Sequence, residues 1–490
     1  MAHVQRHGRM TGPVVTPLEH DIPVAWTVVG TEDWLQTAWM PGALDGIAQV
    51  VVDDPVIDLT PILECLQRMR VLGLDTETAG PYRPNDRGYS MNPLNPDTRV
   101  VLLQVGNQEQ VFLVEPALIP YFKGVLESGQ ALHVGHNLIY DFKWLLVKYG
   151  IHVQRMYCSM LAEQILTAGL MGMRVNLADS VRRRKPYWII NKALRDLFIH
   201  LDHVKGCPDC HPGRNRRLTR EMGYYAARDI TLLFPLMREQ LMELKHWQLD
   251  RVAQVEFDII PATAEMETEG VDLYLPVMRL LIEGWSQKER ELSEEFFKLY
   301  FAALKQAGKE KETLLGNLNF GFNLKSNAAK LQALRELDID LDNVQRSTLT
   351  NAARGVVEKK SGKKKVEMKL DVTADERRML EIFAEFSEAA KYTTTYGRNM
   401  VEKISPVTGR WHPRFKQLGS GEEEGRKSGG EDKATIATGR FSSDAQQFPK
   451  PKDVFVRVVN PKELQQVLAY FASTIETVKA VEIAKQTGAA

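Results

Sequence analysis

The sequence has few cysteines, no net charge and no long apolar run, and each absence excludes a class of protein. Four cysteines among 490 residues are too few for a disulfide scaffold, which predicts a reducing, cytoplasmic location. Basic and acidic residues both total 63, so a nucleic-acid-binding surface would have to be local. No run of 18 apolar residues occurs and residues 1–12 lack an apolar core, so neither a membrane span nor a secretion signal is predicted.

The length of the chain predicts several domains rather than one hydrophobic core. We expect an N-terminal extension at 1–50, an α/β domain at 51–248, a mostly α-helical region at 249–450 and a helical tail at 451–490. In the second region apolar strands come first and helices follow, which is typical of an α/β layer structure. After about residue 250 the sequence becomes charged and amphipathic at helical spacing.

Local patterns predict the elements of the α/β domain. In order, they are a strand at 71–78, a hairpin at 99–116, a strand at 131–138, a helix at 139–150 and a helical region from about 157 to 245. The hairpin is expected to turn around Gly106–Asn107. The first helix is expected to end at Gly150, because glycine commonly terminates helices.

Four carboxylates lie on three of these elements. Asp75 and Glu77 are two residues apart on a strand, so both side chains leave the same face. Asp141 lies near the start of a helix, and Tyr225 shares a helical face with Asp229 four residues later. Carboxylate oxygens are hard ligands that suit two Mg²⁺ or Mn²⁺ ions. Two such ions, about 3.5–4 Å apart, clamp the attacking and leaving oxygens of a phosphoryl displacement.

Each motif alone has a plainer structural interpretation. A lone D-x-E pair, or a tyrosine and an aspartate at helical spacing, recurs often by chance on protein surfaces. An aspartate near a helix start, such as Asp141, commonly stabilises the helix dipole. Here the three motifs occur in order, each after a suitable predicted element. The joint pattern therefore favours a metal-dependent nuclease site.

The segments LGLDTETAG, VGHNLIYDFKWL and YYAARDITLLFPL resemble the three exonuclease motifs of the ribonuclease D and DNA polymerase I proofreading family, with the tyrosine form of the third motif. This resemblance implies that residues 51–248 form a ribonuclease H-like 3′-5′ exonuclease domain.

The resemblance also implies a role for each catalytic residue. Asp75 would bridge both metal ions, and Glu77 and Asp229 would complete the site of the ion that activates water. Asp141 would hold the second ion through water, and the phenol of Tyr225 would position the nucleophile.

Beyond the third motif, four segments resemble parts of family A DNA polymerases in their family order. The segment 256–273 resembles the start of the polymerase region. The segments 322–341 and 383–419 resemble sequence in and after the thumb, and TGRFSS lies at 438–443. The resemblance implies that residues 249–450 are a partial polymerase region that includes the thumb. A lysine cluster at 357–369 would then lie at the thumb tip, although a solvated loop is an equal interpretation.

DNA is the partner that the resemblance to DNA polymerases implies. The expected contacts are phosphate and terminal-nucleotide contacts that position DNA without reading its sequence. The residues proposed for them are Thr76, Thr78, His136, Asn137, Lys391, Thr394, Arg410, His412, Arg440, Ser442 and Ser443.

The sequence departs from family A polymerases after Ser443. No segment there resembles the palm carboxylate motifs or the lysine-bearing fingers helix. We therefore expect the N-terminal half of a split or truncated DNA replication polymerase, which polymerises only with a second polypeptide carrying palm and fingers. Two alternatives remain, a ribonuclease D-like RNA 3′-exonuclease and a non-catalytic DNA-binding subunit. An amphipathic helix expected after Asn460 would pack on its own domain or dock the missing half.

A possible zinc site lies between the second and third exonuclease motifs. His200, His203, Cys207, Cys210 and His211 provide one C-x₂-C pair with flanking histidines, and four of them would suffice for tetrahedral Zn²⁺. The alternative is an exposed, reduced loop, because a single C-x₂-C pair with cramped spacing is weak evidence.

Overall fold

The computed structural model describes residues 25–30, 48–51, 58–83, 88–89, 91–168, 170, 173–186, 198, 218, 220–309, 323–361, 364–418 and 442–443. The chain divides into two compact units. The first, called here the sheet unit, comprises Met1–Gly270 and Pro413–Asp444, and the second, the helical unit, comprises Val271–His412 and Ala445–Ala490. The domain boundaries expected at residues 50, 248 and 450 stay predictions.

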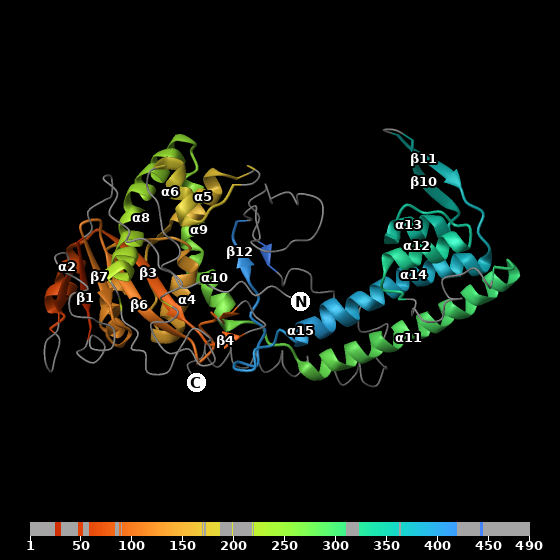
Figure 1. The fold of residues 1–490 in the computed structure, drawn as a ribbon, viewed down its shortest axis with the longest axis horizontal. Coiled ribbons are helices and arrows are strands. Elements are labelled where there is room, and N and C mark those ends of the chain that lie inside the picture. The colour runs from red at the N-terminus through yellow and green to blue at the C-terminus, as the bar shows by residue number, and fades with distance from the viewer. Residues whose placement is uncertain are drawn as a thin grey trace, which may run out of the picture. The chain divides into compact units, whose positions relative to one another are not determined.

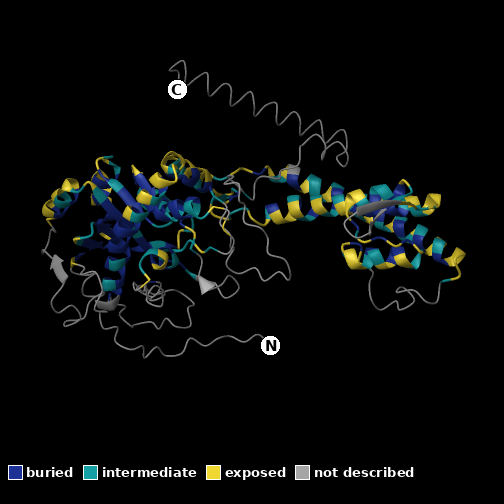
Figure 2. Ribbon diagram, turned by 90° about the horizontal axis from the view of Figure 1, so that it is seen from above, coloured by how far each residue is buried: buried dark blue, intermediate teal, exposed yellow. Residues whose placement is uncertain are grey.

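The sheet unit contains a seven-stranded sheet in the order β2-β1-β7-β6-β3-β8-β9. The strands are β1 (Ala25–Val29), β2 (Ala48–Val51), β3 (Val71–Ala79), β6 (Arg99–Gly106), β7 (Gln110–Val114), β8 (Leu132–Gly135) and β9 (Met156–Cys158). Strand β6 is antiparallel to both of its neighbours, and every other pairing is parallel. Most residues of β1, β3, β6, β7, β8 and β9 are buried (Figure 2), which explains their continuous apolar sequences.

Helices flank these strands. They are α2 (Thr60–Arg68), the 3₁₀ turn η1 (Pro116–Phe122), α3 (Lys123–Glu127), α4 (Leu138–Tyr149), α5 (Ser159–Leu166), α6 (Leu177–Arg184), α8 (Arg220–His246), α9 (Asp250–Asp258) and α10 (Ile260–Glu269). Helix α4 is the helix predicted at 139–150, and it ends at Gly150, which has a left-handed φ of 63°. The predicted hairpin is β6–β7, and the amide of Asn107 donates to the carbonyl of Gln110 in its turn. Strands β1, β2 and β9 were not predicted.

Helices α8 and α4 cover opposite faces of β3, and Figure 1 shows α8 running beside the strands. Gly73 faces α8, since a Cβ at this position would lie 2.5 Å from Cγ2 of Ile230. Asp75, two residues later, shares that face. The hydroxyls of Thr76 and Thr78, on the alternate face, bond to side chains of α4. Because side chains alternate along β3, one face of this strand contacts α8 and the other face contacts α4.

The helical unit is built on two long antiparallel helices, α11 (Leu275–Gln306) and α14 (Ala374–Thr393), which lie side by side (Figure 1). Between them come α12 (Asn327–Glu336), α13 (Arg346–Ala353) and the antiparallel hairpin of β10 (Val356–Ser361) and β11 (Lys364–Lys369). A π-helical turn (Thr394–Arg398) and α15 (Asn399–Val401) follow α14. The lysine cluster thus lies on a hairpin rather than in a loop, because its valines favour strand pairing.

The chain returns to the sheet unit at Pro413, after the first part of the helical unit. Strand β12 (Phe415–Lys416) pairs with β13 (Ser442–Ser443), which contains the end of the TGRFSS segment. The amide of Phe415 donates to Glu267 Oε1 at 2.7 Å, and Gln417 Nε2 donates to the carbonyl of Glu256 at 2.7 Å. These bonds attach the returning segment to α9 and α10.

Two short strands, β4 (Tyr82–Arg83) and β5 (Gly88–Tyr89), form a further antiparallel pair. The predicted helix after Asn460 and the zinc cluster at 200–211 lie outside the described residues. Among the helices that the structure describes, none has the length and apolar character needed to cross a membrane.

We expect Gly73→Ala to separate β3 from α8 and to destabilise the sheet unit by about 1–3 kcal/mol, because the added methyl overlaps Ile230. Hydrogen–deuterium exchange of peptides from β3 and α8 measures the loss. Ile230→Ala should restore part of it in the double variant. Gly124→Ala is the control, since a Cβ there meets nothing within 4 Å. Equal effects of the two alanines would contradict the close approach.

Lys330 is a buried cation in the helical unit. Its side chain is only 2% exposed, and Nζ donates to Ser387 Oγ at 2.6 Å. The rings of Phe383 and Phe386 lie 5.8 and 5.7 Å from this nitrogen. Burial lowers the pKa of Lys330 from 10.5 to about 8. The folded state therefore binds this proton less tightly than the unfolded chain.

Lys330→Met should stabilise the helical unit at pH 7 by about 1–2 kcal/mol, because the fold no longer buries a charge. The gain should shrink as the pH rises from about 8 to 10.5, because the folded lysine is then neutral while the unfolded chain loses its proton only near 10.5. Exchange rates of peptides from α12 and α14 provide the measurement. Lys298→Met, at an exposed position, is the control. If the gain in stability did not depend on pH, it would come from packing alone.

Candidate active site

Three carboxylates converge where β3 meets α8. Asp75 and Glu77 lie on β3, Asp229 lies on α8, and one ligand atom from each falls within 4.8 Å of the others. Glu77 and Asp229 are both 8% exposed. Like charges this close repel each other strongly in a buried site, and a divalent cation would relieve that repulsion.

Asp141 is the fourth carboxylate, in the first turn of α4. Its side chain is 2% exposed, and Oδ1 accepts hydrogen bonds from Thr76 N at 3.0 Å and Thr76 Oγ1 at 2.6 Å. Burial raises the pKa of Asp141 well above its usual value, and the charge of Asp75 raises it further. The hydrogen bonds from Thr76 oppose this shift because they favour the charged form.

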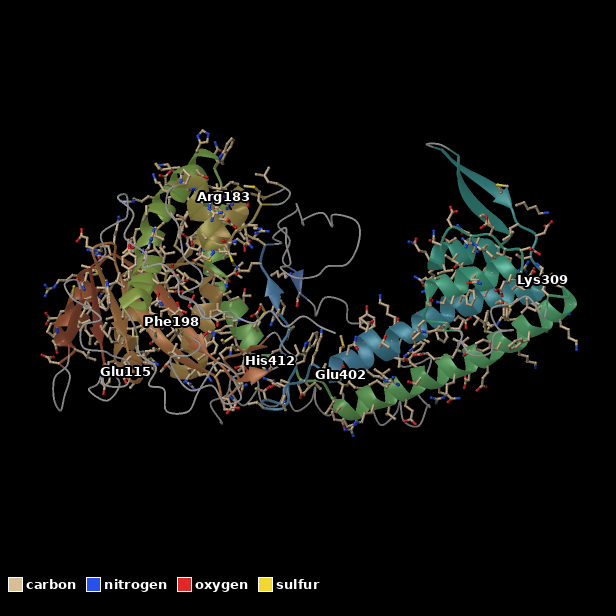
Figure 3. All side chains as sticks on the ribbon, in the orientation of Figure 1. Glu115, Arg183, Phe198, Lys309, Glu402 and His412 are labelled. Atoms are coloured by element: carbon tan, nitrogen blue, oxygen red, sulfur yellow. The ribbon has the colours of Figure 1, made fainter. Side chains whose placement is uncertain are left out.

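Tyr225 lies one helical turn before Asp229 on α8 and is 7% exposed. Its ring centroid is 6.1 Å from that of the buried Phe198, which is labelled within the sheet unit in Figure 3. Burial raises the pKa of Tyr225 above its usual value. The negative charges of Asp229 and Glu77 raise this pKa further, and the phenol is hydrogen-bonded to Asp229. The phenol therefore stays protonated and acts as a hydrogen-bond donor.

The predicted nucleic-acid contacts nearest this cluster also have structural partners. Thr76 holds Asp141, and the hydroxyl of Thr78 lies 2.6 Å from that of Tyr140. His136 Nδ1 lies 2.9 Å from Ser159 Oγ. Asn137 precedes α4 with a left-handed φ of 64°. Contact of these residues with nucleic acid stays a prediction.

The remaining predicted contacts are divided between the two units. Lys391, Thr394, Arg410 and His412 belong to the helical unit, where His412 Nε2 lies 2.6 Å from Thr408 Oγ1. Ser442 and Ser443 form β13 in the sheet unit. Arg440 and the cluster His200, His203, Cys207, Cys210 and His211 lie outside the described residues.

Gln104 is a site residue that the sequence analysis missed. It lies on β6 in register with Asp75, is completely buried, and its amide lies against the carboxylates of β3. The signal was a single polar residue inside the apolar run RVVLLQVG. A polar side chain in a fully buried strand requires a polar partner.

The donor set fits a hard divalent cation. Carboxylate oxygens from Asp75, Glu77 and Asp229 are the ligands that Mg²⁺ and Mn²⁺ prefer, and they converge from two separate elements. Asp141 lies close enough to Asp75 to feel its charge. The cluster is therefore a candidate metal site in the described part of the chain.

Comparison with protein families identifies the domain around this site. Residues 52–244 match the family model described as 3′-5′ exonuclease. This part of the chain is a 3′-5′ exonuclease domain. The match spans the whole site, including β3, α4 and α8. Together with the helices that follow the domain, the match confirms the predicted fold class, a ribonuclease H-like α/β domain followed by a mostly helical region, and it supports a nuclease activity for this domain.

Several solved structures are similar to parts of the chain. NrnC of Brucella melitensis is 15% identical over 50% of this chain and 94% of its own, with a TM-score of 0.34. The catalytic core of RRP6 from Trypanosoma brucei is 18% identical over 42% and 50%, with a TM-score of 0.32. The POL domain of Pol1 from M. smegmatis, in complex with DNA primer-template and dNTP, is 13% identical over 82% and 56%, with a TM-score of 0.48. No curated protein matches.

We expect Asp141→Asn to stabilise the exonuclease domain in EDTA at neutral pH, on the order of 1 kcal/mol, because the fold disfavours the ionised carboxylate. The gain should fade as the pH falls toward 3.8, where the aspartate of the unfolded chain is itself protonated. Thermal unfolding across pH measures this, with exposed Asp97→Asn as the control. A destabilised Asp141→Asn variant in EDTA would contradict this interpretation.

Proposed function

We propose that the protein is a metal-dependent 3′-5′ DNA exonuclease of the proofreading type. The observation that carries this proposal is the convergence of Asp75, Glu77 and Asp229 within 4.8 Å, inside the domain that matches the exonuclease family. Three carboxylates at this distance are unfavourable without a cation, and structural packing alone gives no reason to assemble them.

Each residue of the site would have a separate role in phosphodiester hydrolysis. Asp75, Glu77 and Asp229 would hold one or two Mg²⁺ or Mn²⁺ ions. Asp141, whose carboxylate accepts a hydrogen bond from Thr76, would be a further ligand. Bound ions would activate water and stabilise the charge on the leaving oxygen. Tyr225, whose phenol stays protonated beside Asp229, would orient the attacking water by a hydrogen bond.

The proposal of DNA rather than RNA rests on the sequence that follows the domain. The segments at 256–273, 322–341, 383–419 and 438–443 resemble family A DNA polymerases, not ribonuclease D. We propose that the helical unit is the thumb of such a polymerase and serves replication together with palm and fingers residues on a second polypeptide. Its described cations, including Lys391 and Arg410, would contact the DNA backbone.

The proposal is tested with a 5′-labelled primer–template and a matched RNA, each with Mg²⁺ and with Mn²⁺. The wild type should release mononucleotides from the DNA 3′ end, and Asp75→Asn/Glu77→Gln should lose at least about 100-fold in rate, since removal of the ion binding site removes its charge stabilisation. Glu109→Gln, at an exposed position in the β6–β7 turn, should retain full activity.

The other outcomes separate the alternatives. Preferential shortening of RNA would replace the proofreading proposal with a ribonuclease D-like exonuclease. Tight DNA binding without any release of nucleotides would indicate a non-catalytic DNA-binding subunit. Extension of the primer on addition of dNTPs would contradict the proposed need for a separate palm and fingers.

A further inference from the structure

Gln104 lies beside the carboxylates of the candidate active site. It is completely buried on β6, between Leu103 and Val105, which are buried as well. In the antiparallel pairing of β6 with β3, Gln104 is the partner of Asp75. Side chains of directly paired residues leave the same face of a sheet. The amide of Gln104 is therefore directed toward the face that carries Asp75 and Glu77.

The orientation of the Gln104 amide follows from its neighbours. With the nitrogen turned toward α8, it lies 3.1 Å from Asp75 Oδ2 and 3.1 Å from the carbonyl oxygen of Ala226. The opposite orientation places the nitrogen 3.4 Å from Glu77 Oε1 and directs the amide oxygen at acceptors. The first orientation satisfies more hydrogen bonds. In either orientation the amide donates to a carboxylate of β3.

A neutral donor at this place has two consequences. It stabilises a carboxylate in the charged form without adding a positive charge that would compete with a bound cation. Its second bond reaches Ala226, the residue that follows Tyr225 on α8 and precedes Asp229 by three positions. Gln104 thereby links the strand and the helix that supply the two halves of the carboxylate cluster.

We propose that Gln104 is a positioning residue that sets the affinity of the carboxylate cluster for divalent cations. This inference rests on the proposed metal-dependent function. By holding Oδ2 of Asp75 and the backbone of α8, Gln104 orients the remaining carboxylate oxygens of the cluster toward one point. Groups that orient metal ligands in this way typically change metal affinity by about 10–100-fold when they are removed.

The test is Gln104→Met, which keeps the volume of the side chain and removes the amide. The dissociation constant for Mn²⁺, measured by electron paramagnetic resonance without nucleic acid, should rise by about tenfold. Exonuclease assays should show a higher Mn²⁺ requirement, an unchanged KM for DNA and a kcat that recovers at saturating Mn²⁺. Gln110→Met is the matched control, because it removes a hydrogen bond to Thr27 Oγ1 in the same sheet, away from the carboxylates.

A second variant keeps the inference falsifiable if Gln104→Met does not fold. Gln104→Asn retains the amide but withdraws it by one methylene, and its Mn²⁺ affinity should also fall below that of the wild type. Wild-type Mn²⁺ affinity in either folded variant would overturn the role of Gln104, as would a kcat that stays low at saturating Mn²⁺. A wild-type protein that binds no Mn²⁺ would instead refute the proposed metal site itself.

Discussion

Mutual repulsion among the acidic side chains is the constraint around which the exonuclease domain is organised. Asp75, Glu77 and Asp229 lie together at the junction of β3 and α8, and Asp141 lies near enough to feel the charge of Asp75. Such a cluster lowers stability in the absence of a cation, so the rest of the domain must hold it in place. The close approach at Gly73 brings α8 onto β3. This approach sets the distance between Asp229 on α8 and the two carboxylates on β3.

Neutral hydrogen-bond donors lie against this cluster. Thr76 donates twice to Asp141, and the amide of Gln104 lies against the carboxylates of β3. A lysine or arginine in the same positions would neutralise the carboxylates and exclude a metal ion. Neutral donors add no positive charge that would compete with a divalent cation for the carboxylates. The domain thus retains a local instability where its chemistry is expected, as functional sites commonly do.

Much of the fold was predictable because the longer elements have local signals. The apolar pattern and the turn residues alone predict three features. They are the apolar strand β3, the hairpin of β6 and β7, and the end of α4 at Gly150. Strands β1, β2 and β9 have three to five residues each, and only pairing with distant strands defines them. Their sequences contain too few positions for any periodicity to be detected.

The same contrast applies to the site. The four carboxylates and Tyr225 follow from the order of three motifs, but the sequence gives no register between β3 and β6. Gln104 is 29 positions from Asp75 along the chain (104 − 75), and only the pairing of the two strands makes them neighbours. The role of Thr76 toward Asp141 likewise depends on the packing of α4 against the sheet. Residues that support a site are therefore harder to predict than residues that form it.

Along the chain, the first part of the helical unit, Val271–His412, lies between two segments of the sheet unit. The polypeptide segment that bonds to Glu267 and Glu256 is synthesised only after residues Val271–His412. A chain released at Gly270 would contain every carboxylate of the site, yet Glu267 Oε1 would lack the amide of Phe415. During translation the exonuclease domain therefore reaches its final set of contacts late, once the inserted helices have emerged from the ribosome.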